Sequence, residues 1–433
     1  MAASNVVARP PRRWRWLRRF CLAIVALVLA AIAWDVASYD ARPWLADYQR
    51  LKHDMAQGYA NLDWIATHRR LDLAALDRDT TAALNRAHSR VRAFLALRGF
   101  VKRFGDPHLR LEPAQRPASQ PLASTTDRMT EPADPAAGAD CKAAGYEEDE
   151  HAFILPFATL PDWHALPGKH FPAGRFGDVG VLRIAQFGEQ RYLAACRQVF
   201  RAGVGQRALQ LKVRAYLQLE LARTLAALHA GGARRLLVDV TGNGGGSEWV
   251  SEVIALLAPG ELERAAPRMS APTCDRGRVW YGETGCPVLA PDGERERISG
   301  RGAWPGRIFV LTDHGTASAS EDLVAWLQQN QAATVLGERT LGAGCGYVDG
   351  GGRTTLSVAP FDVVMPNCAR FLADGTNEIE GIAPDVAIAL HDEDGMQRLV
   401  TALAQPALRA ALVTPPPPPA PATAVPPRSR PAP

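Results

Sequence analysis

Two buried strand–turn–helix units place the strongest constraint on the fold of this chain. The mainly apolar run 235–240, Arg-Leu-Leu-Val-Asp-Val, leads into a glycine-rich turn at 242–246, and a helical pattern follows it. A second apolar run, 308–312, leads through a turn of small residues into another helical pattern. Continuous apolar runs that are each followed by a helix are typical of parallel strands covered on both faces. The sequence therefore predicts a mixed α/β core whose sheet is at least partly parallel.

The parts of the chain outside this core differ from it in composition. Leucines and arginines recur at helical spacing over 45–104, which predicts a helical N-terminal subdomain within 39–112. Residues 113–150 begin with a Pro- and Ala-rich stretch and are predicted to be a linker, and the core then extends over 151–405. The tail, 406–433, contains five consecutive prolines and is predicted to be disordered.

The N-terminus carries an export signal. Six arginines between Arg9 and Arg19 precede an unbroken apolar run over 20–34. We expect residues of about 16–38 to be an uncleaved membrane anchor, within a basic stub and anchor at 1–38. A signal peptide cleaved after Ala31-Ile32-Ala33 is the alternative. In both cases the arginines stay in the cytoplasm, and the body lies in the periplasm or outside the cell.

Cysteine usage agrees with export. Besides Cys21 in the apolar run there are six cysteines, and an even number in an exported chain suggests disulfides. Of the 15 pairings that six cysteines allow, the local ones are Cys274 with Cys286 and Cys345 with Cys368. The sequence has no C-x-x-C pair and its histidines show no metal-ligand spacing, so no metal is expected. The net charge of +4 and the lack of a basic stripe give no support to nucleic-acid binding.

The turn of small residues at 316–321, Thr-Ala-Ser-Ala-Ser-Glu, contains a candidate nucleophile. Ser318 would stand at the start of a helix, where a hydroxyl needs a base to become reactive. Ser318 and Glu321 also have the S-x-x-E form of a capping box, which satisfies backbone donors and does no chemistry. This turn alone leaves both interpretations open.

The glycine turn at 242–246 is a candidate oxyanion hole. Its N–H groups are not screened by side chains, which suits an oxyanion hole or an anion site, although a plain strand–helix turn would look the same. The turn lacks the G-K-[ST] ending of a Walker A loop and the spacing of G-x-G-x-x-G.

Five motifs in order resemble the C-terminal-processing (tail-specific) peptidases and the tricorn core protease. The glycine strand is similar to their D-x-R-x-N-x-G-G, with Thr241 where arginine is usual, and 316–321 matches their T-A-S-A-S-E. Residues 337–342 resemble G-E-x-T-x-G, 381–385 resemble G-I-x-P-D, and 106–108 resemble D-x-H. The resemblance implies a crotonase-like core of ββα units.

Within that family the resemblance favours one of two branches. The tail-specific branch uses a lysine as base, but Ala343 occupies that position and no lysine follows Ser318. The other branch uses Ser, His and Glu, which implies Ser318 as nucleophile, His108 as base and Glu378 as its orienter, with Glu380 as second choice. An imidazole changes charge near neutral pH and suits this role. The oxyanion donors would be the N–H of Ala319 and of Gly245 or Gly246.

The resemblance has a further consequence for domain content and function. Residues 112–178 are too short and too Pro-rich at their start for the PDZ domain that tail-specific peptidases usually insert there, so none is expected. The sequence thus predicts a membrane-tethered serine endopeptidase that acts on polypeptides and needs no cofactor. A catalytically inactive peptide-binding member of the same family is the alternative, and an esterase with the same triad is a weaker one.

Overall fold

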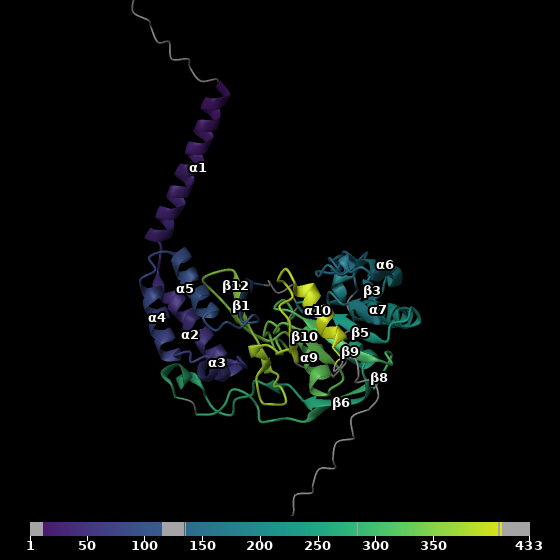
Figure 1. Cartoon of the computed structure of the whole chain (residues 1–433). Helices are drawn as coiled ribbons and strands as arrows, with labels where there is room; N and C mark the ends of the chain where they lie inside the picture. Colours follow the sequence, from purple (N-terminus) through teal and green to yellow (C-terminus); the bar gives the residue numbers. More distant parts are fainter. Residues whose placement is uncertain (1–11, 115–133, 135, 284, 406–407, 409–433) are drawn as a thin grey trace, which may run out of the picture.

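The structure, a computed structural model, describes residues 12–114, 134, 136–283, 285–405 and 408. In this part of the chain, ten helices and a mostly parallel central sheet form a mixed α/β body, and one long helix projects from it (Figure 1). The predicted fold class is confirmed.

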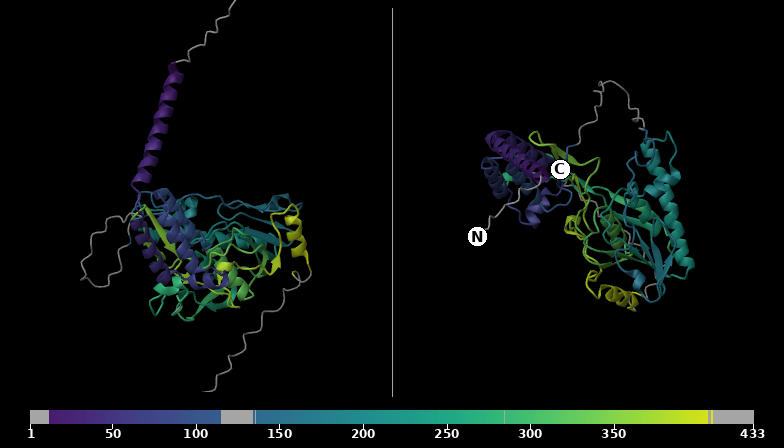
Figure 2. Two further views of the ribbon diagram at one scale, coloured as in Figure 1. Left: turned by 90° about the vertical axis from the view of Figure 1, so that its left-hand side faces the viewer. Right: turned by 90° about the horizontal axis from the view of Figure 1, so that it is seen from above.

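The projecting helix is α1, Arg12–Ala37. Its segment Arg18–Ala37 has 20 residues, is long and apolar enough to cross a membrane, and has no residue buried against the rest of the protein. Figure 2 shows α1 as a straight rod that leaves the body beside the other N-terminal helices.

The N-terminal helices share a hydrophobic core with segments from much later in the chain. Tyr48, Leu51 and Phe100 from these helices pack together with Trp280 and Val363, which come from distant parts of the sequence. The later segments that contain Trp280 and Val363 therefore complete the hydrophobic core of the helical subdomain. Its helices are α2 Ala41–Gly58, α3 Leu62–His68, α4 Leu73–Asn85 and α5 Arg90–Lys102, and Trp280 lies in the short helix η3, Gly277–Tyr281.

A small antiparallel sheet connects this subdomain to the rest of the body. Strand β1, Arg110–Pro113, pairs with β12, Phe361–Met365, which also pairs with β11, Gly352–Thr355. Because His108 directly precedes β1, this pairing brings the histidine to a loop more than 200 residues further along the chain.

The central sheet has seven strands in the order β14-β10-β9-β5-β4-β3-β2. The five strands from β14 to β4 are parallel, and β3 and β2 extend the sheet as antiparallel strands. The two predicted buried strands are β5 and β9, which lie side by side. The strands are β2 His164–Leu166, β3 Ala173–Phe176, β4 Val179–Arg183, β5 Arg235–Asp239, β9 Arg307–Thr312, β10 Thr334–Gly337 and β14 Val386–Ala387.

Both faces of this sheet are covered, as the continuous apolar runs predict. Leu236 and Val238 of β5 point into a core shared with helices α6 to α9, whereas Leu237 packs on the other face in a core that includes α10. These helices are α6 Leu193–Val199, α7 Gln206–Ala230, α8 Trp249–Leu257, α9 Ala319–Gln329 and α10 Gly395–Ala404.

Adjacent parallel strands bring the two motif turns together. In the pairing of β5 with β9, Asp239 lies opposite Leu311, so the glycine turn and the Ser318 turn leave neighbouring strands at the same edge of the sheet. Ligands of open α/β sheets bind outside this carboxyl edge. Two small ribbons complete the body: β6 Pro259–Ala265 with β8 Arg295–Arg301, and β7 Arg268–Met269 with β13 Cys368–Ala369.

Three disulfides cross-link the described residues. Cys274–Cys286 and Cys345–Cys368 are the two local pairs that the sequence suggested, and Cys141 pairs with Cys196. This third disulfide fixes part of the predicted linker to the core, where Tyr146 is buried as well. The rest of the linker, 115–133, and the predicted tail other than Leu408 lie outside the described residues.

Candidate active site

Ser318 has a strained backbone conformation at the start of α9. Its φ of 55° and ψ of −116° are unusual for a residue with a side chain, and such strain is found mainly at functional sites. The residue is half-buried, and its N–H donates to Oε2 of Glu321 at 2.8 Å. The S-x-x-E pattern thus does cap the helix, and it does so while Ser318 lines a pocket.

The buried carboxylate of Glu321 attaches a second loop to the Ser318 turn. Its Oε1 accepts from Thr340 Oγ1 at 2.6 Å and from the Gly342 N–H at 2.7 Å. Its Oε2, besides binding Ser318, accepts from the N–H groups of Ala343 at 2.9 Å and Gly344 at 3.2 Å. One carboxylate therefore fixes the loop at 340–344 relative to the candidate nucleophile.

The same loop holds His108. The ring Nδ1 of His108 lies 2.8 Å from the carbonyl oxygen of Ala343. A carbonyl oxygen can only accept, so Nδ1 carries the hydrogen and Nε2 is left with its lone pair in the neutral imidazole. A Cβ on Gly346 would lie 3.0 Å from His108 Cε1, so the loop passes directly against the ring.

Further contacts fix the backbone on either side of the imidazole. The His108 N–H donates to Asp106 Oδ1 at 2.9 Å, and the hydroxyl of Tyr347 donates to the His108 carbonyl oxygen. The other oxygen of Asp106 accepts from Tyr59 and Asn61. Asp106 therefore fixes the turn before β1.

Glu378 lies deep in the site and pairs with an arginine. It is 1 % exposed, and its Oε2 accepts from Arg370 Nε at 2.7 Å. Burial raises the pKa of Glu378, and the Arg370 charge opposes that rise. Among the described contacts, none joins His108 to Glu378 or to Ser318. Glu380, the second choice, accepts from Trp64 and Arg69 instead.

Arg370 connects Glu378 to Ser318. Its Nη2 donates to the carbonyl oxygens of Ser318 at 3.2 Å and Gly344 at 3.0 Å, and its Nη1 lies 2.9 Å from Asp322 Oδ1. Burial works against the charged form, but the carboxylates of Asp322 and Glu378 outweigh it and raise the pKa of Arg370. Arg370 belongs to none of the short motifs, so sequence reasoning missed it.

The glycine turn packs against Ser318. A Cβ on Gly245 would lie 2.8 Å from both Ala319 N and Ser318 Cβ, so only glycine fits there. The Gly245 N–H donates to Asn243 Oδ1 at 2.9 Å. Among the described residues, nothing accepts from the N–H groups of Gly246 and Ala319. Those two donors, which line one pocket together with Ser318, are the ones available to an oxyanion.

An arginine of the neighbouring strand β4 contacts the motif strand near Thr241, the position where arginine is usual. Asp239 is buried and lies 3.1 Å from Arg183 of the neighbouring strand β4, and Arg183 also donates to Thr241 Oγ1 at 3.3 Å. Burial raises the pKa of Asp239, and the Arg183 charge opposes the rise. Thr241 in the motif is thus accompanied by an arginine from β4.

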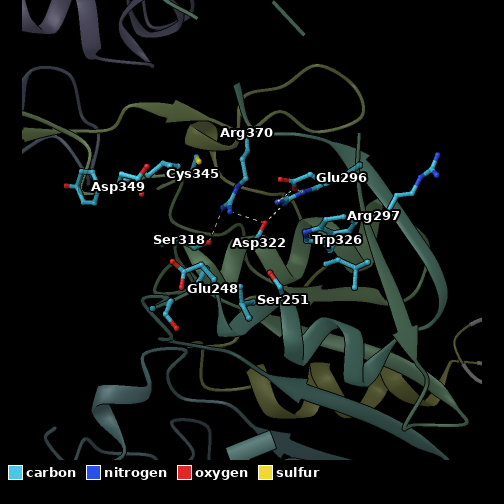
Figure 3. Close-up of a pocket in the computed structure, with 18 residues that line it drawn as sticks. Glu248, Ser251, Glu296, Arg297, Ser318, Asp322, Trp326, Cys345, Asp349 and Arg370 are labelled. Atoms are coloured by element: carbon cyan, nitrogen blue, oxygen red, sulfur yellow. Dashed lines mark hydrogen bonds and ion pairs between the residues drawn. The ribbon is translucent and has the colours of Figure 1, made fainter. Parts of the chain in front are cut away.

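A pocket of about 640 Å³ opens beside Ser318. Figure 3 shows Ser318, Asp322 and Trp326 in a row along one side of it, one helical turn apart on α9. Arg264 lies 4.5 Å over the Trp326 ring and pairs with Asp322 and with Glu296 of β8. The pocket therefore combines an aromatic wall with the ion pairs of Arg264.

Comparisons with known proteins agree with this geometry. Residues 178–388 match the model of peptidase family S41. A carboxyl-terminal-processing protease from Synechocystis is 34 % identical over 128 residues, which cover 29 % of this chain and 25 % of that protein. The matched region thus spans about a quarter of this curated relative.

Two solved structures share the fold over most of the chain. A putative peptidase from Parabacteroides merdae has a TM-score of 0.53 at 16 % identity, covering 85 % of this chain and 98 % of its own. Mature CPAF, complexed with lactacystin, has a TM-score of 0.55 at 14 % identity, covering 84 % and 96 %. These two likenesses show a shared fold, whereas the similarity to peptidase family S41 is carried by residues 178–388 of this chain.

Proposed function

We propose that this protein is a serine-type peptidase that hydrolyses internal peptide bonds through an acyl-enzyme on Ser318. The observation that carries the proposal is the strained backbone of Ser318, φ 55°, held between Glu321 and Arg370 at the mouth of a pocket. A helix cap alone does not need such strain, because ordinary caps adopt extended backbone angles.

The proposed reaction uses His108 as base and two backbone donors. Ser318 Oγ attacks the substrate carbonyl while His108 Nε2 takes its proton and later gives it to the leaving amine. The N–H groups of Ala319 and Gly246 stabilise the oxyanion. Water then attacks the acyl-enzyme with His108 again as base.

The environment of His108 changes the proposed role of Glu378. Nδ1 of His108 is held by the carbonyl oxygen of Ala343, which fixes the tautomer without a carboxylate. Glu378 contributes through Arg370, which it binds at 2.7 Å and which contacts the Ser318 carbonyl. We therefore propose Glu378 as a positioning residue of the nucleophile turn.

The test is labelling with a fluorophosphonate probe together with hydrolysis of an unfolded protein such as reduced casein. Wild type should be labelled on Ser318 and should cleave the substrate, and Ser318→Ala should do neither while remaining folded. His108→Ala should lose activity by about 100-fold or more, the usual size of a general-base effect. Thr401→Ala, at an exposed position of α10, is the matched control. A folded wild type that is not labelled would favour the inactive, peptide-binding alternative.

We also propose that α1 anchors the protein, with its body outside the cytoplasm. The supporting observations are an apolar helix at Arg18–Ala37 with no residue buried, the arginines before it, and three disulfides in the body. Alkaline extraction of membranes should leave the full-length chain in the pellet. Recovery of a soluble form that begins after Ala33 would show that a signal peptide had been cleaved instead.

A further inference from the structure

The ribbon of β6 and β8 has one closed edge and one open edge. In the part of the chain that the structure describes, the two strands pair only with each other, in an antiparallel register that sets Glu263 opposite Arg297. On the far side of β6, the Glu263 N–H donates to Asn330 Oδ1 at 2.9 Å. Its N–H therefore points away from β8, which identifies Glu263 and Arg297 as a pair without mutual backbone hydrogen bonds.

The flanking pairs confirm this alternation. Three positions from Glu263, the Ala266 N–H donates to Glu294 O at 3.0 Å, and at the other end the Gly302 N–H donates to Ala258 O at 2.9 Å. Hydrogen-bonded and open pairs alternate along an antiparallel ribbon. The backbone N–H and C=O groups of Arg295, Arg297 and Ser299 consequently point to the outer edge of β8. Among the described residues, these groups have no hydrogen-bond partner.

This open edge borders the pocket of Ser318. Glu296, Arg297 and Ile298 all line the pocket that Ser318 and Ala319 line. Side chains of a strand alternate between its faces, so three successive lining residues present backbone as well as side-chain atoms to the pocket, which Arg264 of β6 also lines. Figure 3 shows the Arg297 side chain extending away from Ser318, and it pairs with Glu263 at 3.0 Å.

The charges of the pocket do not offer a site for a free carboxylate. Its three described arginines are each held by carboxylates: Arg264 by Glu296 and Asp322, Arg297 by Glu263, and Arg370 by Asp322 and Glu378. A substrate's terminal carboxylate would have to displace one of these pairs.

We propose that the outer edge of β8 binds an extended segment of the polypeptide substrate as an added strand and guides the scissile bond to Ser318. This inference rests on the proposed peptidase function. Backbone pairing of this kind recognises the main-chain groups of the substrate rather than its side chains. The preferred substrate is therefore an unfolded polypeptide of varied sequence, cleaved internally and without need for a free C-terminus.

The first test uses the unaltered protein and a series of ten-residue peptides, each N-methylated at one position. Methylation should lower kcat/KM by about five-fold or more at alternate positions on one side of the scissile bond, because it removes a single backbone hydrogen bond. A C-terminal amide should be cleaved as fast as the acid. A uniform response along the peptide, or a strong preference for the acid, would overturn the proposal.

The second test removes the donor on the protein. Arg297→Pro deletes an N–H that makes no bond to β6, and prolines are tolerated at strand edges. Its kcat/KM for the ten-residue peptide should fall at least five-fold below that of Arg297→Ala, which loses the same side chain but keeps the N–H. Equal values for the two variants would contradict the proposal.

Fluorophosphonate labelling separates this inference from the proposed function. If wild-type Ser318 is labelled but neither the methylated peptides nor Arg297→Pro shows the predicted effect, only the β8 inference fails. If wild-type Ser318 is not labelled at all, the peptidase proposal itself fails. Should Arg297→Pro not fold, the methylated peptides on wild type still decide the question.

Discussion

The guanidinium of Arg370 donates a hydrogen bond to the backbone carbonyl oxygen of Ser318 at 3.2 Å. On the other side of the same residue, the Ser318 N–H is held by Glu321. Arg370 and Glu321, both buried, thus bind the backbone of Ser318 on its carbonyl and N–H sides. Both side chains also bind the loop whose Ala343 carbonyl oxygen contacts His108. This arrangement suggests how the site keeps its unfavourable backbone angles.

We expect Arg370→Lys to impair the site severely. An ammonium group cannot reach the four acceptors that the planar guanidinium serves, so either Glu378 or the carbonyl oxygens of Ser318 and Gly344 lose their buried donor. The free energy of unfolding should fall by about 3–5 kcal/mol, and Ser318 labelling should slow by roughly 100-fold because the nucleophile shifts. Denaturant unfolding and probe kinetics measure the two effects. Arg398→Lys, at an exposed ion pair, is the control and should change stability by less than about 1 kcal/mol.

Two substitutions of Ser318 should differ in stability in an unusual direction. Glycine adopts positive φ without strain, whereas alanine keeps the Cβ that makes φ 55° unfavourable. Ser318→Gly should therefore be more stable than Ser318→Ala by about 1 kcal/mol, although both are inactive. Urea unfolding checks this. At Ser299, within strand β8, the alanine variant should be more stable than the glycine variant, since glycine weakens a strand. If alanine is the more stable replacement at Ser318 as well, then Ser318 is not strained.

Glu321→Gln should destabilise the protein although the glutamine and glutamate side chains have nearly the same shape. Each carboxylate oxygen now accepts from at least two donors, and an amide would replace one of these oxygens with a donating NH2 group. Leaving buried N–H groups unsatisfied should lower the free energy of unfolding by about 3 kcal/mol. Glu261→Gln, on an exposed part of β6, serves as the control. Near-equal stability of the two variants in urea would show that the carboxylate does not hold the loop.

The protein should lose stability in mild acid because of two buried histidines. His151 stacks on Tyr192 at 4.4 Å and His170 packs against the same ring, and burial lowers the pKa of both. The unfolded chain then takes up protons below about pH 6.5 that the folded protein does not bind, so stability is retained above that pH and falls as the pH drops.

The loss can be measured by urea unfolding at pH 7.5 and pH 5. Each histidine can contribute up to about 1.4 kcal/mol per pH unit in this window. Replacing His151 and His170 with phenylalanine should flatten the pH dependence, whereas His53→Gln, at an exposed position, should not. A double variant with the wild-type slope would assign the effect to other groups.

Much of the fold could be predicted because it depends on local patterns. The strands β5 and β9 are short continuous apolar runs followed by turns, and α7 shows helical spacing over its whole length. The disulfides Cys274–Cys286 and Cys345–Cys368 join neighbours in sequence. By contrast, Cys141–Cys196 spans 55 residues, and spacing gave no reason to prefer it.

In the candidate site, the sequence predicts the residues, whereas the tertiary structure determines their partners. The sequence by itself predicted Ser318, His108 and Glu378 as site residues and showed no lysine after Ser318, because motifs and residue types are local properties. Only the tertiary structure could show that Ala343, 235 residues away, holds His108, and that Arg370, 52 residues away, contacts Ser318. Such partners are set by which strands pair and which loops meet, and long-range packing leaves no short pattern in the sequence.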